Sequence, residues 1–79
     1  MLQNAKFFSE KLNHCLDEMG APQMVRDRAS ILSKMVGIPK QQAWVLLEGH
    51  QLPSDDVLQK IASEFEVEPR WLSGEKKHR

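Results

Sequence analysis

The chain has 79 residues, in which 11 lysines and arginines balance 11 aspartates and glutamates. A chain of this length forms a single domain, here residues 1–79, with a small core, because it buries only about 60% of the surface that its unfolded form exposes. That size excludes a separate substrate domain, and the zero net charge excludes the overall positive field of a strong non-specific nucleic-acid binder.

The N-terminal stretch at 1–20 is amphipathic and interrupted by charges, without the apolar run of a signal peptide or a membrane span. The single cysteine, Cys15, cannot form an internal disulfide. We therefore expect a soluble, cytoplasmic protein with no membrane partner. It should be folded over about residues 4–74 and end in a basic tail at 75–79.

A first helix is predicted over about residues 4–19. Its buried stripe consists of apolar residues at helical spacing, namely Phe8, Leu12, Cys15, Leu16 and Met19. Gly20 and Pro22 end this helix. On that stripe Cys15 is expected to be an inert core residue. The stretch at 21–27 has no clear period, so the pattern leaves the start of the next helix open.

Two short helices joined by a tight glycine turn are predicted between Arg28 and Gly49. The first has Ala29, Leu32 and Val36 at helical spacing, and Gly37 ends it. The second runs over about residues 40–48. Its inward residues are Ala43, Leu46 and Leu47, and its outward residues are Gln41, Trp44, Val45 and Glu48. These two helices and the turn between them, which together form a two-helix corner, have the spacing of a DNA-reading helix-turn-helix.

A fourth helix is predicted to begin after Pro53 and Ser54, with Asp55 and Asp56 at its positive N-terminal end. Its buried stripe should consist of Leu58, Ile61, Ala62 and Phe65. A short fifth helix is predicted with Pro69 in its first turn and Gly74 at its end, and Trp71 is expected to be a structural residue at the bottom of the core. The expected fold is all-α, with five short helices and no strands.

Charge is unevenly distributed along the chain. The segment 24–51 is locally basic, and the segment 52–68 is acidic, with Lys60 as its one cation. The C-terminal basic residues, Lys76, Lys77, His78 and Arg79, either lie along a nucleic acid as a flexible arm or are simply solvated.

The sequence resembles the lambda-repressor and Cro-like helix-turn-helix family, the xenobiotic-response-element type of bacterial and phage regulators, over about residues 7–75. The matching segments are Arg28-Ala29, Leu32-Ser33, Val36-Gly37-Ile38, Leu46-Leu47-Glu48-Gly49, Leu52-Pro53 and Val67-Glu-Pro-Arg-Trp-Leu-Ser-Gly-Glu75. The resemblance implies a compact five-helix domain, bacterial or phage-encoded and nucleoid-associated, that binds double-stranded DNA as a homodimer. Many such repressors continue into a further domain, so the chain is either a stand-alone regulator or a DNA-binding fragment.

By position, the resemblance assigns roles to two sets of residues. The base-edge candidates are Lys40, Gln41, Trp44, Val45 and Glu48, on a helix that lies in the major groove. The phosphate candidates are Arg28, Ser30 and Lys34. Gln42 lies toward the flank. Each polar residue also has a simpler interpretation as a solvated side chain; for Gln41 the alternatives are bidentate contact with adenine or no contact.

The sequence departs from the family pattern in three places. Pro39 stands where a serine or threonine usually caps the third helix, so that cap is lost or moved. Trp44 and Val45 are apolar at outward positions that are usually polar. Glu66 replaces a common glycine, which we interpret as a minor change at a helix end.

Trp44 therefore has three possible roles: contact with thymine methyl groups and sugars, an anchor for a protein interface, or core. The first supports our leading hypothesis, a sequence-specific transcriptional regulator that acts as a repressor on a near-palindromic operator with half-sites about 34 Å apart. The second supports an alternative, a protein-interaction module that uses the Trp44 and Val45 face, such as an antitoxin, anti-activator or accessory subunit.

Catalysis finds little support in the sequence. The three histidines stand alone, and His14 and Cys15 are neighbours that point about 100° apart on a helix, unlike an i, i+4 metal pair. Asp55 and Asp56 are explained by the start of a helix. We expect no enzyme activity, no metal site and no cofactor.

Overall fold

The computed structural model describes residues 4–75. Over that range the chain forms five helices and no strand: α1 (Ala5–Glu18), α2 (Val25–Val36), α3 (Lys40–Leu47), α4 (Asp55–Phe65) and α5 (Pro69–Leu72). The predicted all-helical architecture is confirmed for these residues. The predicted basic tail lies outside the described residues except for Glu75.

Local signals in the sequence begin and end the helices. The Asn4 side chain accepts hydrogen bonds from the amides of Lys6 and Phe7, at 2.8 and 3.2 Å, and so caps α1. The Ser54 side chain accepts one from the amide of Val57 at 3.4 Å and caps α4. At the end of α2, Gly37 adopts a left-handed conformation with φ 72°, which side chains other than glycine rarely tolerate.

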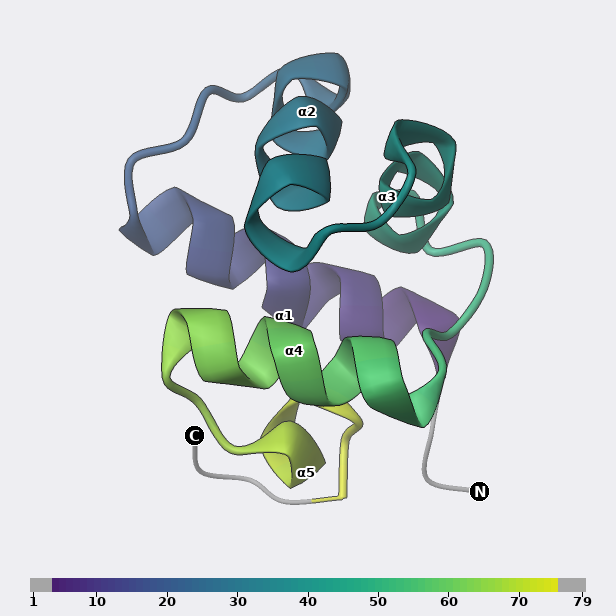
Figure 1. The fold of residues 1–79 in the computed structure, drawn as a ribbon. Helices are drawn as coiled ribbons and strands as arrows, with labels where there is room; N and C mark the ends of the chain where they lie inside the picture. The colour runs from purple at the N-terminus through teal and green to yellow at the C-terminus, as the bar shows by residue number, and fades with distance from the viewer. Residues whose placement is uncertain (1–3, 76–79) are drawn as a thin grey trace.

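The helices surround one core. Figure 1 shows α1 crossing the middle of the molecule, with α2 and α3 on one side and α4 and α5 on the other. Helix α2 packs against α3 and α4, while α1 contacts α3 and α5. Every helix contributes at least one fully buried large side chain, from the set Phe8, Leu12, Leu16, Leu32, Leu46, Ile61 and Leu72. Each is worth about 1.5–3 kcal/mol in transfer free energy, so the core depends on all five helices.

The predicted core is largely confirmed, with three corrections. Met19 is 51% exposed, because it follows the last residue of α1 and occupies the C-cap position. Leu58 and Phe65 are only partly buried, and Val57 takes a core position on α4 instead. Cys15 and Trp71 are buried as expected. None of the helices over residues 4–75 is long and apolar enough to cross a membrane.

Candidate nucleic-acid interface

The turn between α2 and α3 is held by a compact set of hydrogen bonds. The amides of Gly37 and Ile38 both donate to the carbonyl oxygen of Ser33, at 2.9 and 3.3 Å. The Ser33 hydroxyl donates in return to the carbonyl oxygen of Ile38. These bonds fix the exit of α2 and the entry of α3, so the two helices form a rigid corner. Pro39 occupies the N-cap position of α3, and no side chain caps that helix, so of the two alternatives the cap is lost.

Helix α3 separates its residues into two faces. Ala43, Leu46 and Leu47 are buried against the rest of the domain. The opposite face is open to solvent: Lys40, Gln41, Trp44 and Glu48 are exposed, and Val45 is half-buried. The structure therefore brings four base-edge candidates together on the outward side of α3, and the fifth, Glu48, follows at the C-cap position. Gln42 is half-buried at its flank.

The outward face of α3 includes an open hollow of about 450 Å³. Lys40, Gln41, Trp44 and Val45 line it, so a cation, an amide and two apolar side chains share one surface. Trp44 is 36% exposed, which is inconsistent with its interpretation as a core residue. The two remaining roles for Trp44, nucleic-acid contact and protein contact, both need the exposure that it has.

The three phosphate candidates on α2 fall in different environments. Lys34 is exposed in the last turn of the helix, and Ser30 is half-buried. Arg28 is 4% exposed and is not available to a phosphate, so its predicted role as a phosphate contact is wrong. Its guanidinium is occupied within the protein, which explains the burial of a charged side chain.

Arg28 connects α2 to α1 and to the loop between them. Its Nε donates to the carbonyl oxygen of Pro22 at 2.6 Å, and its Nη1 donates to Oδ1 of Asn13 at 2.9 Å and to the carbonyl oxygen of Asn13 at 3.2 Å. Its Nη2 forms an ion pair with Asp17. Asn13 in turn donates to the carbonyl oxygen of Leu47 at 3.2 Å.

Asn13 thus links Arg28 on α2 to the end of α3, through α1. This positioning role of Arg28 and Asn13 was not predicted from the sequence. One feature of the sequence does indicate that Arg28 is buried. Arg28 and Leu32 are four residues apart on one helical face, which places Arg28 on the buried stripe.

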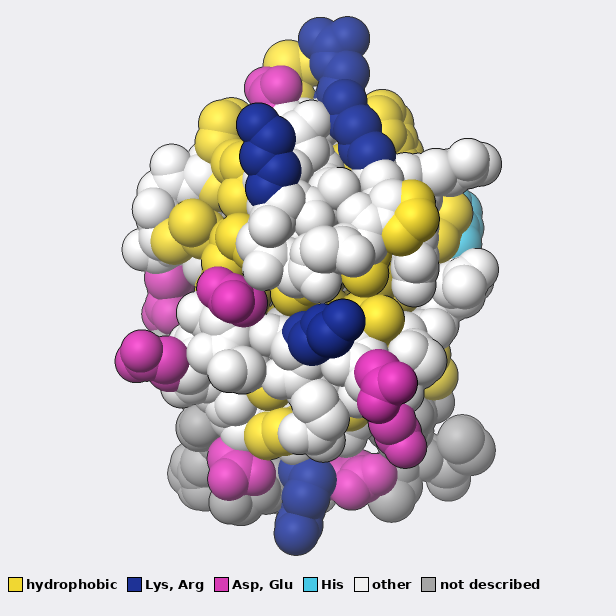
Figure 2. Space-filling model, in the orientation of Figure 1, with side chains coloured by type: hydrophobic (Ala, Val, Ile, Leu, Met, Phe, Trp, Pro, Cys, Tyr) yellow, Lys and Arg dark blue, Asp and Glu magenta, His cyan; other side chains and the backbone are white. Residues whose placement is uncertain are grey.

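Exposed charges are unevenly distributed over the molecule. Figure 2 shows lysine and arginine side chains over α2 at one end and aspartate and glutamate side chains around α4. With Arg28 internal, the exposed cations of α2 and α3 are Arg26, Lys34 and Lys40. The exposed anions of α4 and the following segment are Asp55, Asp56, Glu64, Glu66 and Glu68, and they outnumber the one exposed cation of α4, Lys60. A polyanion is therefore favoured at the α2–α3 corner and disfavoured at α4.

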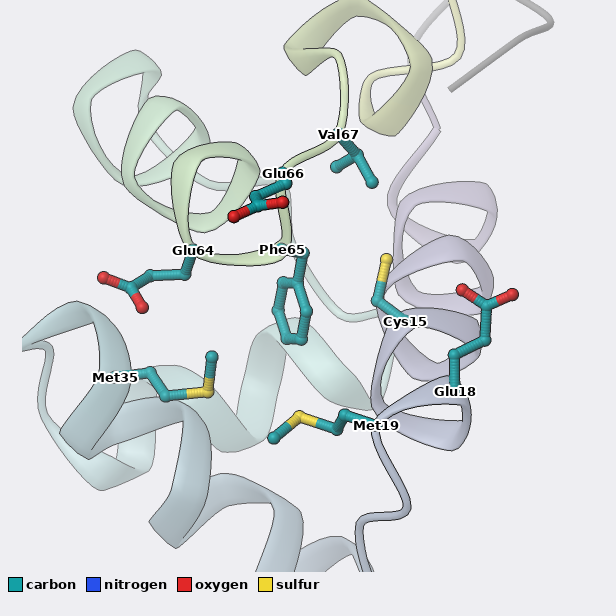
Figure 3. A pocket seen from close by; sticks show the side chains of 8 residues that line it. All are labelled: Cys15, Glu18, Met19, Met35, Glu64, Phe65, Glu66 and Val67. Carbon is teal, nitrogen blue, oxygen red and sulfur yellow. The ribbon is translucent and has the colours of Figure 1, made fainter.

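A second hollow, of about 340 Å³, lies between the C-terminal ends of α1, α2 and α4. Figure 3 shows Met19, Met35 and Phe65 directed toward one another, with the carboxylates of Glu64 and Glu66 at the rim. No residue of α3 lines this hollow. Its acidic rim repels phosphate, so it is a poor nucleic-acid site. Among residues 4–75 no cluster of three or more histidine, cysteine or acidic side chains could hold a metal ion.

Comparison of the chain with protein-family models, with curated proteins and with solved structures gives no match.

Proposed function

We propose that the chain is a sequence-specific double-stranded DNA-binding regulator of transcription, a helix-turn-helix protein of the lambda-repressor and Cro-like type. The observation that carries this proposal is the division of α3. Its inward face is anchored by Leu46 and Leu47, while its outward face presents Gln41 and Trp44 on a rigid corner. A short exposed helix held in this way fits the major groove, which is wide enough to admit an α-helix.

The side chains on α3 have the chemistry for reading base edges. The Gln41 amide carries a donor and an acceptor and can contact N6 and N7 of adenine together. Lys40 at the start of α3 donates to guanine or to a phosphate, and Glu48 at its end accepts from the amino group of cytosine. Lys34 and Ser30 on α2 are the phosphate contacts, since a lysine charge and a hydroxyl both bind phosphate without reading sequence.

The short length of α3 supports a symmetric dimer on a near-palindromic operator. Helix α3 has only eight residues, and its exposed face reaches only a few base pairs, so a single copy has little specificity. Two copies related by a two-fold axis would read two half-sites about 34 Å apart, one turn of the duplex. A protein that occupies such a site blocks polymerase, which is the action of a repressor.

A selection of random duplexes with the purified chain, at two salt concentrations, tests the proposal. We expect one symmetric motif to be enriched and its affinity to fall steeply with added salt, because bound phosphates release counterions. The absence of any enriched motif, together with no binding at low salt, would refute the assignment.

A second candidate function rests on the apolar part of the same face. Exposed tryptophan is enriched at protein-binding hot spots, and the hollow beside Trp44 and Val45 could hold a side chain of a partner protein. The chain would then act as an antitoxin, anti-activator or accessory subunit. A Trp44→Asp variant separates the two functions: loss of a partner with unchanged DNA affinity supports the second, and loss of DNA binding alone supports the first.

A further inference from the structure

The hollow on α3 is lined by both apolar and polar side chains, and this combination suits one kind of base-pair edge. Its apolar lining residues are Trp44 and Val45, and its polar lining residues are Gln41 and Lys40. Trp44 is 36% exposed, so its indole is available to any molecule that contacts α3. A base-pair edge suits this surface only if it can cover the indole without a cost in free energy.

Only one base offers an apolar group in the major groove of unmodified DNA. Guanine and adenine present ring and exocyclic acceptors or donors, and cytosine presents an amino group; thymine adds a C5 methyl group to its carbonyl acceptor. A polar edge pressed against indole and valine loses its water and gains no partner, which costs free energy. A methyl group in the same place is removed from water favourably.

The position of Gln41 relative to Trp44 limits which base pairs the two side chains can contact. Residues three apart on a helix are neighbours on its surface, so the amide of Gln41 and the indole of Trp44 contact the same base pair or adjacent ones. Gln41 suits adenine, and adenine pairs with thymine. The two side chains together therefore fit a short run of A·T pairs, in which a thymine methyl lies beside the adenine edge.

We infer that the Trp44 and Val45 surface reads the C5 methyl group of thymine, next to the base pair that Gln41 reads. This inference rests on the proposed DNA-binding function and specifies how it is exercised. The two apolar residues at outward positions are then specificity residues and replace the usual polar contact. Gln41 contacts the adjacent base edge, and Lys40 contacts the backbone.

Uracil provides a sharp test, because it differs from thymine only by the missing methyl group and keeps every hydrogen-bonding group of the base. The experiment compares binding of the full chain to the best selected duplex and to the same duplex with uracil at each thymine in turn. We expect one position in each half-site at which uracil weakens binding about fourfold, which corresponds to about 0.8 kcal/mol for one buried methyl group.

Two variants identify the residue that reads the methyl group. Trp44→Ala should bind the thymine and uracil duplexes equally, since it removes the apolar wall. Met19→Ala is the matched control, because Met19 is also an exposed apolar side chain but lies in the second hollow, which contains no residue of α3. It should keep the full thymine preference.

The outcomes separate this inference from the function on which it rests. If the chain binds the selected duplex and its uracil forms equally, or if Trp44→Ala keeps the preference, methyl reading by Trp44 is wrong while DNA binding stands. If the chain binds no duplex at low salt, the DNA-binding function itself is wrong, and the methyl inference falls with it.

Discussion

Arg28 on α2 donates a hydrogen bond to Oδ1 of Asn13 on α1 at 2.9 Å, and this contact fixes the α2–α3 corner on the rest of the domain. Asn13 also donates to the carbonyl oxygen of Leu47, at the end of α3. The buried Arg28 therefore holds α2 against α1, and Asn13 connects both helices to the end of α3. The outward face of α3 is positioned by polar contacts as well as by the apolar core.

Replacing Arg28 by methionine should destabilise the fold by about 2–4 kcal/mol, because two carbonyl oxygens and the Asn13 side chain lose their donor and Asp17 loses its cation. Chemical denaturation measures this loss. Arg26→Met is the matched control, since Arg26 is an exposed arginine in the same turn, and it should change stability by less than about 0.5 kcal/mol. Equal denaturation midpoints for the two variants would show that Arg28 has no structural role.

Gly49 should tolerate alanine less well than Gly37 does. Both have positive φ, 79° and 72°, so alanine at either position is strained by about 1 kcal/mol. A Cβ at Gly49 would also lie 3.0 Å from the Ser9 hydroxyl oxygen and 3.4 Å from the Lys6 Cα, whereas a Cβ at Gly37 meets nothing within 4 Å.

We therefore expect Gly49→Ala to cost on the order of 1 kcal/mol more than Gly37→Ala, measured by thermal unfolding. Equal losses would mean that the approach between α1 and the turn after α3 is looser than the structure shows.

Glu66→Gly should stabilise the protein. Glu66 ends α4 with φ 57°, and it is the one residue other than glycine with positive φ among residues 4–75. Relief of that conformation, less the extra entropy of glycine in the unfolded chain, should yield about 0.5–1 kcal/mol. Glu66→Ala removes the same carboxylate but keeps the Cβ, and it should not stabilise. A glycine variant no more stable than the alanine variant would contradict the strain at this position.

Gln41→Ala and Lys34→Ala should affect DNA binding in different ways. The first should relax the preference at one base pair by about 1–3 kcal/mol, because a base-edge contact is lost. The second should weaken binding to all sequences alike and lower the salt dependence by about one counterion. Repeating the duplex selection and the salt titration with each variant measures both effects. An unchanged base preference for Gln41→Ala would remove Gln41 from the reading surface.

Much of the fold is predictable because its signals are local. Asn4 and Ser54 cap helices within a few residues of themselves, and Gly37 ends α2 through its own backbone conformation. The inward and outward faces of α3 also follow from helical spacing alone, so the cluster of Gln41, Trp44 and Val45 could be predicted.

Other features depend on partners that are distant in sequence. Helical spacing places Arg28 on the buried stripe, but it cannot identify the partners of the guanidinium, Asn13 and Asp17, which lie 15 and 11 residues earlier. Periodicity places Met19 on the apolar stripe, but it cannot show that α1 ends one residue before it. The free-energy cost of Glu66 is also hard to predict from the sequence, because it lies in the left-handed backbone conformation and not in a side-chain contact.

The most direct test of DNA binding by α3 uses the two tryptophans, which lie in contrasting places: Trp44 is exposed on α3, and Trp71 is 8% exposed in the core. Each gives one indole N–H signal in an NMR spectrum, and Trp44→Phe assigns the two. Titration with the best selected duplex should shift the Trp44 signal and leave the Trp71 signal in place. A duplex that binds while the Trp44 signal stays unchanged would contradict the assignment of α3 as the reading helix.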